Sequence, residues 1–189
     1  MSTSGDPISL DAMPDEALMQ RIADEDRDAM AVLVRRHQQH VLALAFRFAG
    51  RWHTAEDIGQ EVFIRVFRAA KTYRPDAQFT TWLYRLVANL CWDRRRKIAR
   101  ELRLQPEPPP HDVDPPSAGL ERQDRIERVQ RAILELPDRQ RLAIILHRYQ
   151  SLSHREIAEA TGWSQSAVES CLVRAYKALR DALSDLNST

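Results

Sequence analysis

Aromatic and cationic side chains alternate between residues 79 and 97, and their types suit nucleic-acid binding. They recur at three- and four-residue steps, which places them on one face of a helix. The positions on this face are Trp82, Arg85, Asn89, Trp92 or Asp93, and Arg96. Single-stranded nucleic acid fits such a face, because bases stack on aromatic rings, at ~1–3 kcal/mol per base, while cations neutralise phosphates. The same spacing also fits a core helix with half-buried indoles and solvated arginines, so the pattern alone leaves both interpretations open.

Two predicted helices position this face. The first begins at Thr54, whose side chain can accept from free amides, and the second starts near Phe79. Pro75 disfavours helical geometry at Arg74, so we expect the chain to break between them. The apolar positions are Ile58, Val62, Phe63, Val66 and Phe67 in the first helix, and Phe79, Leu83, Leu86, Val87 and Leu90 in the second. The positions left on another face of the first helix, available to a partner, are Asp57, Gln60, Glu61 and Ile64.

Two more helices are expected before this pair. Residues 1–14 are polar and are expected to form a flexible tail, and a short helix follows to about Ala23. Asp26 can cap a longer helix that runs to about Ala49, with Gly50 as its C-cap. The first half of the chain is therefore predicted to be wholly helical.

Charge is segregated along the chain. Residues 31–100 carry 14 basic and 5 acidic side chains, whereas residues 1–30 carry 2 and 8, and residues 101–121 carry 1 and 5. A basic block between acidic segments predicts a polyanion site. Prolines crowd residues 101–120, so this segment is expected to be an extended linker between two helical domains. It is either a passive tether or an acidic segment that threads a basic channel of a partner.

After the linker, helical periodicity returns. A stripe of Ile126, Val129, Ile133 and Leu136 predicts one helix, which Pro137 ends. Asp138 is expected to cap the next helix, whose core positions are Leu142, Ile145, Leu146 and Tyr149.

The final third carries the spacing of a helix-turn-helix. Ser153-x-x-Glu156 forms a capping box, and Gly162 stands at the turn, where glycine adopts positive φ most easily. Ser164 or Ser166 caps the following helix, and Ser166-x-x-Glu169 offers a second capping box. The spacing of Ala158, Gly162 and Val168 is typical of a motif whose second helix enters the major groove.

The exposed side of that second helix supplies candidate DNA contacts. Gln165 and Arg174 can reach base edges, whereas Lys177 is expected to meet phosphate. A carboxylate near phosphates repels them, so Glu169 is assigned to helix capping rather than to cytosine. The full set on this side is Gln165, Ser166, Glu169, Ser170, Val173, Arg174 and Lys177.

Several function classes find no support in the sequence. Cys91 and Cys171 sit at apolar positions and are expected to be buried thiols, and no spacing of Cys and His suits zinc. No paired carboxylates or nucleophile–base pair indicates an enzyme, and no phosphate-binding glycine loop occurs. The acidic N-terminus is not a signal peptide, and no apolar run is long enough to span a membrane, so a cytoplasmic protein is expected.

Three stretches, in this order, resemble the extracytoplasmic-function (ECF) sigma factors of bacterial RNA polymerase. AEDIGQEVFIRVF is similar to the family's polymerase-docking helix, and matches it at Asp57, Gln60, Glu61 and Phe63. FTTWLYRLVANLCWDRRRK is similar to the segment that melts and reads the minus-ten element, and matches it at Phe79, Trp82, Leu83, Ala88, Asn89, Asp93 and Arg96. LSHREIAEATGWSQSAVESCLVRA is similar to the region that reads the minus-thirty-five element.

The resemblance implies an all-α fold of two small helical domains: sigma region 2 over residues 15–100, and sigma region 4, a winged-helix-like helix-turn-helix, over residues 121–186. It implies core RNA polymerase, through its clamp helices and flap, promoter DNA and an anti-sigma factor as partners, with no cofactor. The implied polymerase contacts are Asp57, Gln60, Glu61, Phe63 and Ile64. The implied minus-ten contacts are Tyr73, Arg74, Phe79, Trp82, Arg85, Asn89 and Arg96, with the loop at 71–79 capturing a flipped base. The implied minus-thirty-five contacts are Gln165, Ser166, Ser170, Arg174 and Lys177.

The recognition helix departs from the family at Glu169 and Cys171, where basic residues are common, so the upstream base preference stays open. The inducing signal and the identity of any anti-sigma factor also stay open. The alternative is a regulator of the LuxR type. Such a protein needs a sensory or receiver domain, often with alternating strands and helices, whereas residues 15–100 show helical periodicity only. A helical protein-binding adaptor is a second alternative, and it predicts no salt-dependent DNA affinity.

Overall fold

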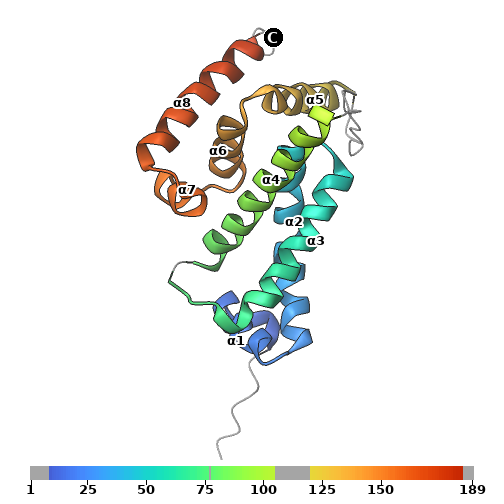
Figure 1. Ribbon diagram of the computed structural model, residues 1–189, viewed down its shortest axis with the longest axis vertical. Coiled ribbons are helices and arrows are strands. Elements are labelled where there is room, and N and C mark those ends of the chain that lie inside the picture. The colour runs from blue at the N-terminus through green and yellow to red at the C-terminus, as the bar shows by residue number, and fades with distance from the viewer. Residues whose placement is uncertain (1–8, 77, 105–119, 185–189) are drawn as a thin grey trace, which may run out of the picture.

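Helices form nearly all of the secondary structure (Figure 1). The computed structural model describes residues 9–76, 78–104 and 120–184. Their elements are η1 (Leu10–Ala12), α1 (Asp15–Ala23), α2 (Arg27–Ala49), α3 (Trp52–Ala69), η2 (Ala70–Thr72), α4 (Phe79–Leu104), α5 (Leu120–Glu135), α6 (Asp138–Tyr149), α7 (His154–Thr161) and α8 (Gln165–Ala182). No strand occurs in these three ranges, which confirms the predicted all-α class.

Helix α2 begins and ends where its sequence predicts. The side chain of Asp26 accepts from the amides of Asp28 and Ala29, which have no partner inside the helix. Gly50 ends the helix with φ of 72°, a left-handed conformation that costs glycine least. A Cβ on Gly50 would lie 2.8 Å from Leu134 of α5, so this glycine also permits close approach of the second half.

Four local predictions fail. The helix predicted from Thr54 begins at Trp52, so Thr54 is a buried residue of the first turn rather than a cap. Asp138 does not cap α6, because Pro137 occupies the N-cap position. The second capping box is absent, since Ser164 rather than Ser166 caps α8. Ile126, predicted to be buried, is 47% exposed.

The predicted tail and linker need separate descriptions. Residues 10–12 form a 3-10 turn, and the carbonyls of Leu10 and Asp11 accept from Arg36 of α2. The rest of the predicted tail, residues 1–8, lies outside the described residues. The linker predicted over 101–120 starts later than expected, because α4 continues to Leu104. Most of it, residues 105–119, lies outside the described residues.

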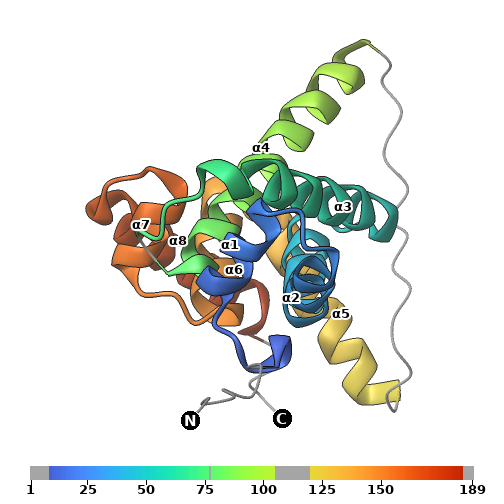
Figure 2. The ribbon, with the colours of Figure 1, turned by 90° about the horizontal axis from the view of Figure 1, so that it is seen from below.

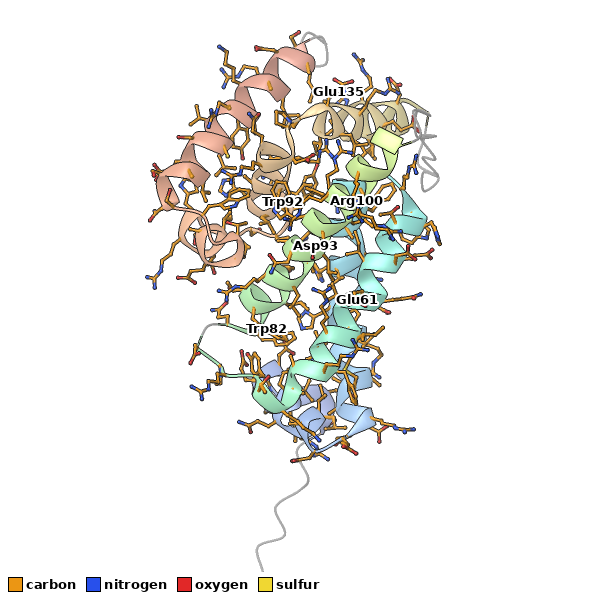
Figure 3. The ribbon with its side chains drawn as sticks, viewed as in Figure 1. Glu61, Trp82, Trp92, Asp93, Arg100 and Glu135 are labelled. Carbon is orange, nitrogen blue, oxygen red and sulfur yellow. The ribbon has the colours of Figure 1, made fainter. Side chains whose placement is uncertain are left out.

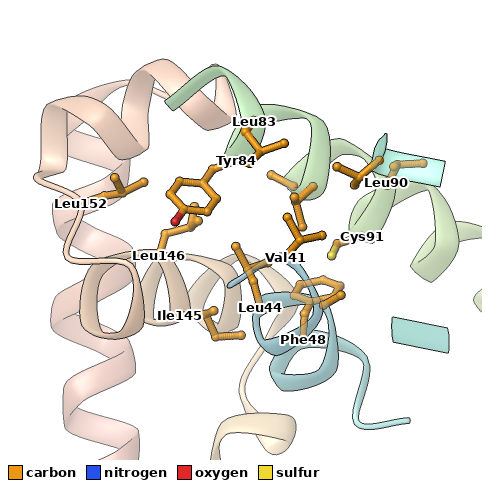
Figure 4. Close-up of a cluster of buried hydrophobic side chains, with 14 of the residues drawn as sticks. Val41, Leu44, Phe48, Leu83, Tyr84, Leu90, Cys91, Ile145, Leu146 and Leu152 are labelled. Atoms are coloured by element: carbon orange, nitrogen blue, oxygen red, sulfur yellow. The ribbon is translucent and has the colours of Figure 1, made fainter. Parts of the chain in front are cut away.

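The two helical halves share one continuous core. The end of α4 and the start of α5 project to opposite sides of the molecule (Figure 2). Between them, α6 packs against α2 and α7 packs against α4, while α8 packs on α6 and α7. The shared cluster joins Val41, Leu44 and Phe48 of α2, Leu83, Tyr84, Leu90 and Cys91 of α4, Ile145 and Leu146 of α6, and Leu152 (Figure 4). The sequence predicts two helical domains, but it does not predict this joint core between them.

Candidate protein and nucleic-acid interfaces

The exposed side of α3 forms a shallow apolar groove, which we call the docking face. Ile64 is 43% exposed and Phe67 is 48% exposed, although Phe67 was expected in the buried stripe. Together with Met30 of α2, these residues enclose a groove of about 640 Å³. Its lining residues are Met30, Gln60, Phe63, Ile64, Phe67 and Arg68. Large apolar side chains gathered on a surface mark a protein interface more often than scattered single ones do.

The acidic residues predicted beside the docking face already have intramolecular partners. Arg94 of α4 donates to Asp57 at 2.6 Å, and Arg65 donates to Glu61 at 2.8 Å along α3. The expectation that these carboxylates stay available to a partner therefore needs revision for Asp57, because its ion pair joins α3 to α4. Both pairs are partly exposed, so a competing partner can exchange them at small cost.

An aromatic cluster surrounds the start of α4. The Tyr73 ring lies 5.0 Å from the Trp82 ring and 6.2 Å from the Phe79 ring, measured between centroids. Trp82 is half-buried, whereas Phe79 is only 1% exposed. Phe79 therefore packs inside the molecule in this conformation and is not available to DNA. Burial, with nearby Glu16, Asp15 and Asp76, raises the pKa of Tyr73, so its phenol stays neutral.

Two residues of the predicted nucleic-acid face of α4, Arg85 and Trp92, meet the second half of the chain. We use this name for Trp82, Arg85, Asn89, Trp92 and Arg96, and Figure 3 labels its two tryptophans. Arg85 donates to the backbone carbonyl of Glu159 in α7 at 2.9 Å. Trp92 lies 6.2 Å from the Trp163 ring in an edge-on arrangement. Asn89 stays exposed, and Arg96 pairs with Asp93 at 2.8 Å.

The helix-turn-helix of α7 and α8 has the geometry that its sequence predicts. Ser153 and Glu156 complete the capping box, and hydrogen bonds from Ser153 hold the pKa of Glu156 below its ordinary value. Gly162 makes the turn with φ of 72°. Glu169, assigned to capping, instead lies 3.7 Å from the His154 ring nitrogen, so that assignment is wrong.

The predicted upstream contacts lie along α8. All five of these side chains are exposed: Gln165, Ser166, Ser170, Arg174 and Lys177. Ser166, Ser170 and Arg174 line an open groove of about 650 Å³ that faces Trp92 of α4 and Asp138 of α6. The two predicted DNA surfaces therefore turn partly toward each other across this groove.

A buried arginine joins the halves. Arg141 of α6 is 5% exposed and donates to the carbonyls of Phe48 in α2 and Leu136 at 3.0 Å, and also to that of Leu134. These carbonyls lie at or beyond the C-terminal ends of α2 and α5, which favour a cation. Burial lowers the pKa of Arg141, and the negative charge of Asp138 only partly offsets this effect. Two further links join the halves: the buried Tyr84 donates to Gln150 at 2.7 Å, and the partly exposed Arg95 pairs with Asp138 at 3.2 Å.

The described ranges contain no group of three His, Cys, Asp or Glu side chains that could hold a metal ion. Within them, no helix is long and apolar enough to cross a membrane. Both cysteines are buried, as expected.

Comparisons with known proteins define the class to which these surfaces belong. Residues 33–101 match sigma-70 region 2, and residues 126–179 match sigma-70 region 4. The two matches fall on α2–α4 and on α5–α8, the halves that carry the two predicted DNA surfaces.

The relatives are RNA polymerase sigma factors. The chain is 30% identical over 189 residues to the RNA polymerase sigma-H factor of Pseudomonas aeruginosa, covering 91% of this chain and 95% of that protein. It is 31% identical to the ECF RNA polymerase sigma factor SigW of Bacillus subtilis, over 89% and 96% of the two chains. It is 36% identical to SigE of Mycolicibacterium smegmatis, where the match spans 62% of the longer relative. This chain belongs to the ECF RNA polymerase sigma factors, as its motifs predicted, and the LuxR-type alternative finds no support.

Solved structures agree with the fold. CnrH, in complex with the cytosolic domain of CnrY, superposes with a TM-score of 0.67 at 27% identity, covering 92% of this chain and 99% of that one. The sigma factor RpoE of Bartonella quintana, in complex with the anti-sigma factor NepR, gives a TM-score of 0.70 at 22% identity, which shows a shared fold.

Proposed function

We propose that this chain binds core RNA polymerase through the docking face, directs it to specific promoters, and opens the minus-ten DNA on the nucleic-acid face of α4. One observation carries the proposal: α3 exposes an apolar groove on the same helical unit whose neighbouring helix, α4, bears aromatic rings between guanidinium groups. Docking one helix therefore fixes the position of the other on the polymerase.

The contacts fall into three sets. Gln60, Phe63 and Ile64 meet the polymerase clamp helices, with Asp57 and Glu61 exchanging their intramolecular ion pairs for polymerase contacts. Tyr73, Arg74, Trp82, Arg85, Asn89 and Arg96 meet the minus-ten strand, and Phe79 supports them from inside. Gln165, Ser166, Ser170, Arg174 and Lys177 meet the minus-thirty-five element. The proposed units are residues 15–100 and 121–186, and the second also contacts the polymerase flap.

The packing of the halves requires a change of conformation before DNA binds. Arg85 and Trp92 contact α7 and Trp163, and Arg174 lines the groove that faces α4. Strand capture on α4 therefore requires the second half to move away. A ligand shifts such an equilibrium only through its differential affinity for the two states, so polymerase must bind the open form more tightly.

The chain acts by binding rather than by catalysis, in the cytoplasm, where polymerase is available. CnrH is described in complex with the cytosolic domain of CnrY. The solved structure of RpoE holds the anti-sigma factor NepR. We propose that this chain too is held inactive by an anti-sigma factor.

Run-off transcription tests the proposed function. Purified core polymerase is supplied with a promoter library, with and without the chain, and the transcripts are sequenced. We expect a defined set of start sites that appears only with the chain. A matched control is the variant Ile64→Ser with Phe67→Ser, which keeps both DNA surfaces but loses the apolar groove. No new start sites with the wild-type chain would contradict the proposal.

A further inference from the structure

The first amide of α4 is paired with a carboxylate from another helix. The Phe79 N–H donates to Glu16 of α1 at 3.0 Å, across 63 positions of sequence. The neighbouring Gln78 contributes its backbone carbonyl, which accepts from Thr81 and Trp82. Amides at a helix start have no partner inside the helix, and a carboxylate there also meets the positive end of the helix dipole. Glu16 thus caps α4 from outside its own segment.

A second acid of α1 reaches the same residue by another route. Asp15 accepts from Arg36 at 2.6 Å and lies 2.7 Å from His37 Nε2. Burial opposes ionisation of Asp15, but the hydrogen bonds from His37 and Arg36 outweigh it, so the pKa of Asp15 lies below its ordinary value. The His37 ring lies 5.2 Å from the Phe79 ring. The two neighbouring acids therefore fix the backbone and the side chain of Phe79 separately.

Phe79 in turn sets the position of the indole. Its ring lies 5.7 Å from that of Trp82, and both belong to the first turn of α4. Tyr73, at the start of the preceding loop, contacts both rings. If the first turn of α4 frays, Trp82 loses both its helical backbone and its packing partner.

We propose that Glu16, assisted by Asp15, is a positioning residue for promoter opening: it holds the first turn of α4, and with it Trp82, in the geometry that captures the separated strand, without touching DNA itself. This inference rests on the proposed function, because it requires the nucleic-acid face to act on the minus-ten strand. It assigns a role to a helix that carries none of the predicted DNA or polymerase contacts.

The test compares Glu16→Ala and Glu16→Gln in the reconstituted holoenzyme. Three quantities are measured: affinity for core polymerase, closed-complex formation at low temperature, and permanganate reactivity of the minus-ten thymines. We expect Glu16→Ala to lower the ratio of open to closed complex about five-fold, the effect of losing one helix cap. Core affinity and closed-complex formation should stay unchanged. Glu16→Gln keeps an acceptor oxygen and should restore most of the opening.

A matched control removes a carboxylate with no link to α4. Asp11 pairs with Arg35 of α2 at 2.8 Å in an exposed position, and Asp11→Ala should leave opening unchanged. Circular dichroism at the assay temperature checks that each variant is folded. If Glu16→Ala is not folded there, Asp15→Asn replaces it, with the same expected loss of opening at unchanged core affinity.

The outcomes separate the inference from the function on which it rests. If wild-type chain opens no promoter, the proposed function fails. If wild-type chain opens promoters and neither Glu16→Ala nor Asp15→Asn reduces opening, the positioning role fails alone. Equal loss in Glu16→Ala and Glu16→Gln, together with loss of core affinity, indicates general destabilisation and also overturns the positioning role.

Discussion

The docking face of α3 and the nucleic-acid face of α4 belong to neighbouring helices but differ in what covers them. Ile64 and Phe67 of α3 are nearly half exposed. On α4, Arg85 donates to α7 and Trp92 packs edge-on against Trp163. A single conformation therefore presents the surface proposed for polymerase while it withholds much of the surface proposed for DNA. This difference orders the two events, because polymerase can bind first and DNA cannot.

The contacts that cover α4 also indicate what opening costs. Individual links such as Arg95–Asp138 are partly exposed, and such pairs contribute about 0–1 kcal/mol each. The apolar cluster beneath them is different, since Leu83, Ile145 and Leu146 are fully buried. Exposing it costs about 25 cal/mol for each Å² of apolar surface. Opening therefore needs a partner with substantial binding energy, as a polymerase interface provides.

The largest expected effect comes from truncating the apolar side chains of the exposed docking face. Ile64→Ala with Phe67→Ala should weaken binding to core polymerase by about 4 kcal/mol, if each side chain is an anchor worth about 2 kcal/mol. The folded state should change little, because both side chains are already nearly half exposed. Affinity is measured by fluorescence anisotropy, with Ile126→Ala as control, another exposed apolar residue. If Ile126→Ala weakened polymerase binding equally, the docking face would have no specific role in that binding.

The next largest effect concerns the packing of the two halves, which covers the nucleic-acid face of α4. Arg141→Met should lower the free energy of unfolding by about 3 kcal/mol, because the carbonyls of Phe48, Leu134 and Leu136 lose a buried donor. Denaturant titration measures it. The control is Arg155→Met, since Arg155 is 83% exposed and pairs only along its own helix. A change below 1 kcal/mol for Arg141→Met would show that this residue does not hold the halves together.

Trp82→Ala tests the face that opening uncovers. Loss of one stacking platform should reduce open-complex formation by about 2 kcal/mol while closed-complex formation holds. Permanganate reactivity of the minus-ten region reports the change. Trp52→Ala serves as the control, because Trp52 is a half-exposed tryptophan outside the nucleic-acid face. Undiminished reactivity would assign Trp82 to the core alone.

The smallest expected effect is that of Arg174→Ala, which tests whether α8 of the second half contacts a base of the upstream element. We expect a loss of about 1–2 kcal/mol that depends on one upstream base pair, since a base contact loses its discrimination when it is removed. Binding is compared across single-base variants of the upstream element. A uniform loss over all variants would instead make Arg174 a phosphate contact.

Local patterns predicted much of the fold. The Asp26 cap, the Gly50 and Gly162 helix ends and the Ser153–Glu156 box all appear where the sequence places them, because each depends on residues within a few positions. The sequence does not distinguish Ser164 from Ser166 as the cap of α8, because both hydroxyls stand within reach of the first free amides. Element type could be read from the sequence, but the exact first residue depended on packing.

The links between distant segments could not be predicted. The Glu16–Phe79 cap and the Arg141 contacts join residues far apart in the sequence, and no periodicity encodes such pairs. Arg141 leaves one trace, as a charged residue directly before the apolar run 142–146. The predicted site residues lie on α3, on α4 and the loop before it, and on α8. Which of them are covered by the other half of the chain depends on the tertiary packing.

The most direct test of the account compares strand binding by the free chain and by the holoenzyme. A fluorescent single strand carrying the minus-ten sequence is titrated with the chain alone, with core polymerase alone and with the two together. The account predicts that the chain alone binds at least about 100-fold more weakly than the holoenzyme, because α7 and Trp163 cover the nucleic-acid face. Equal affinity of the free chain and the holoenzyme would contradict it.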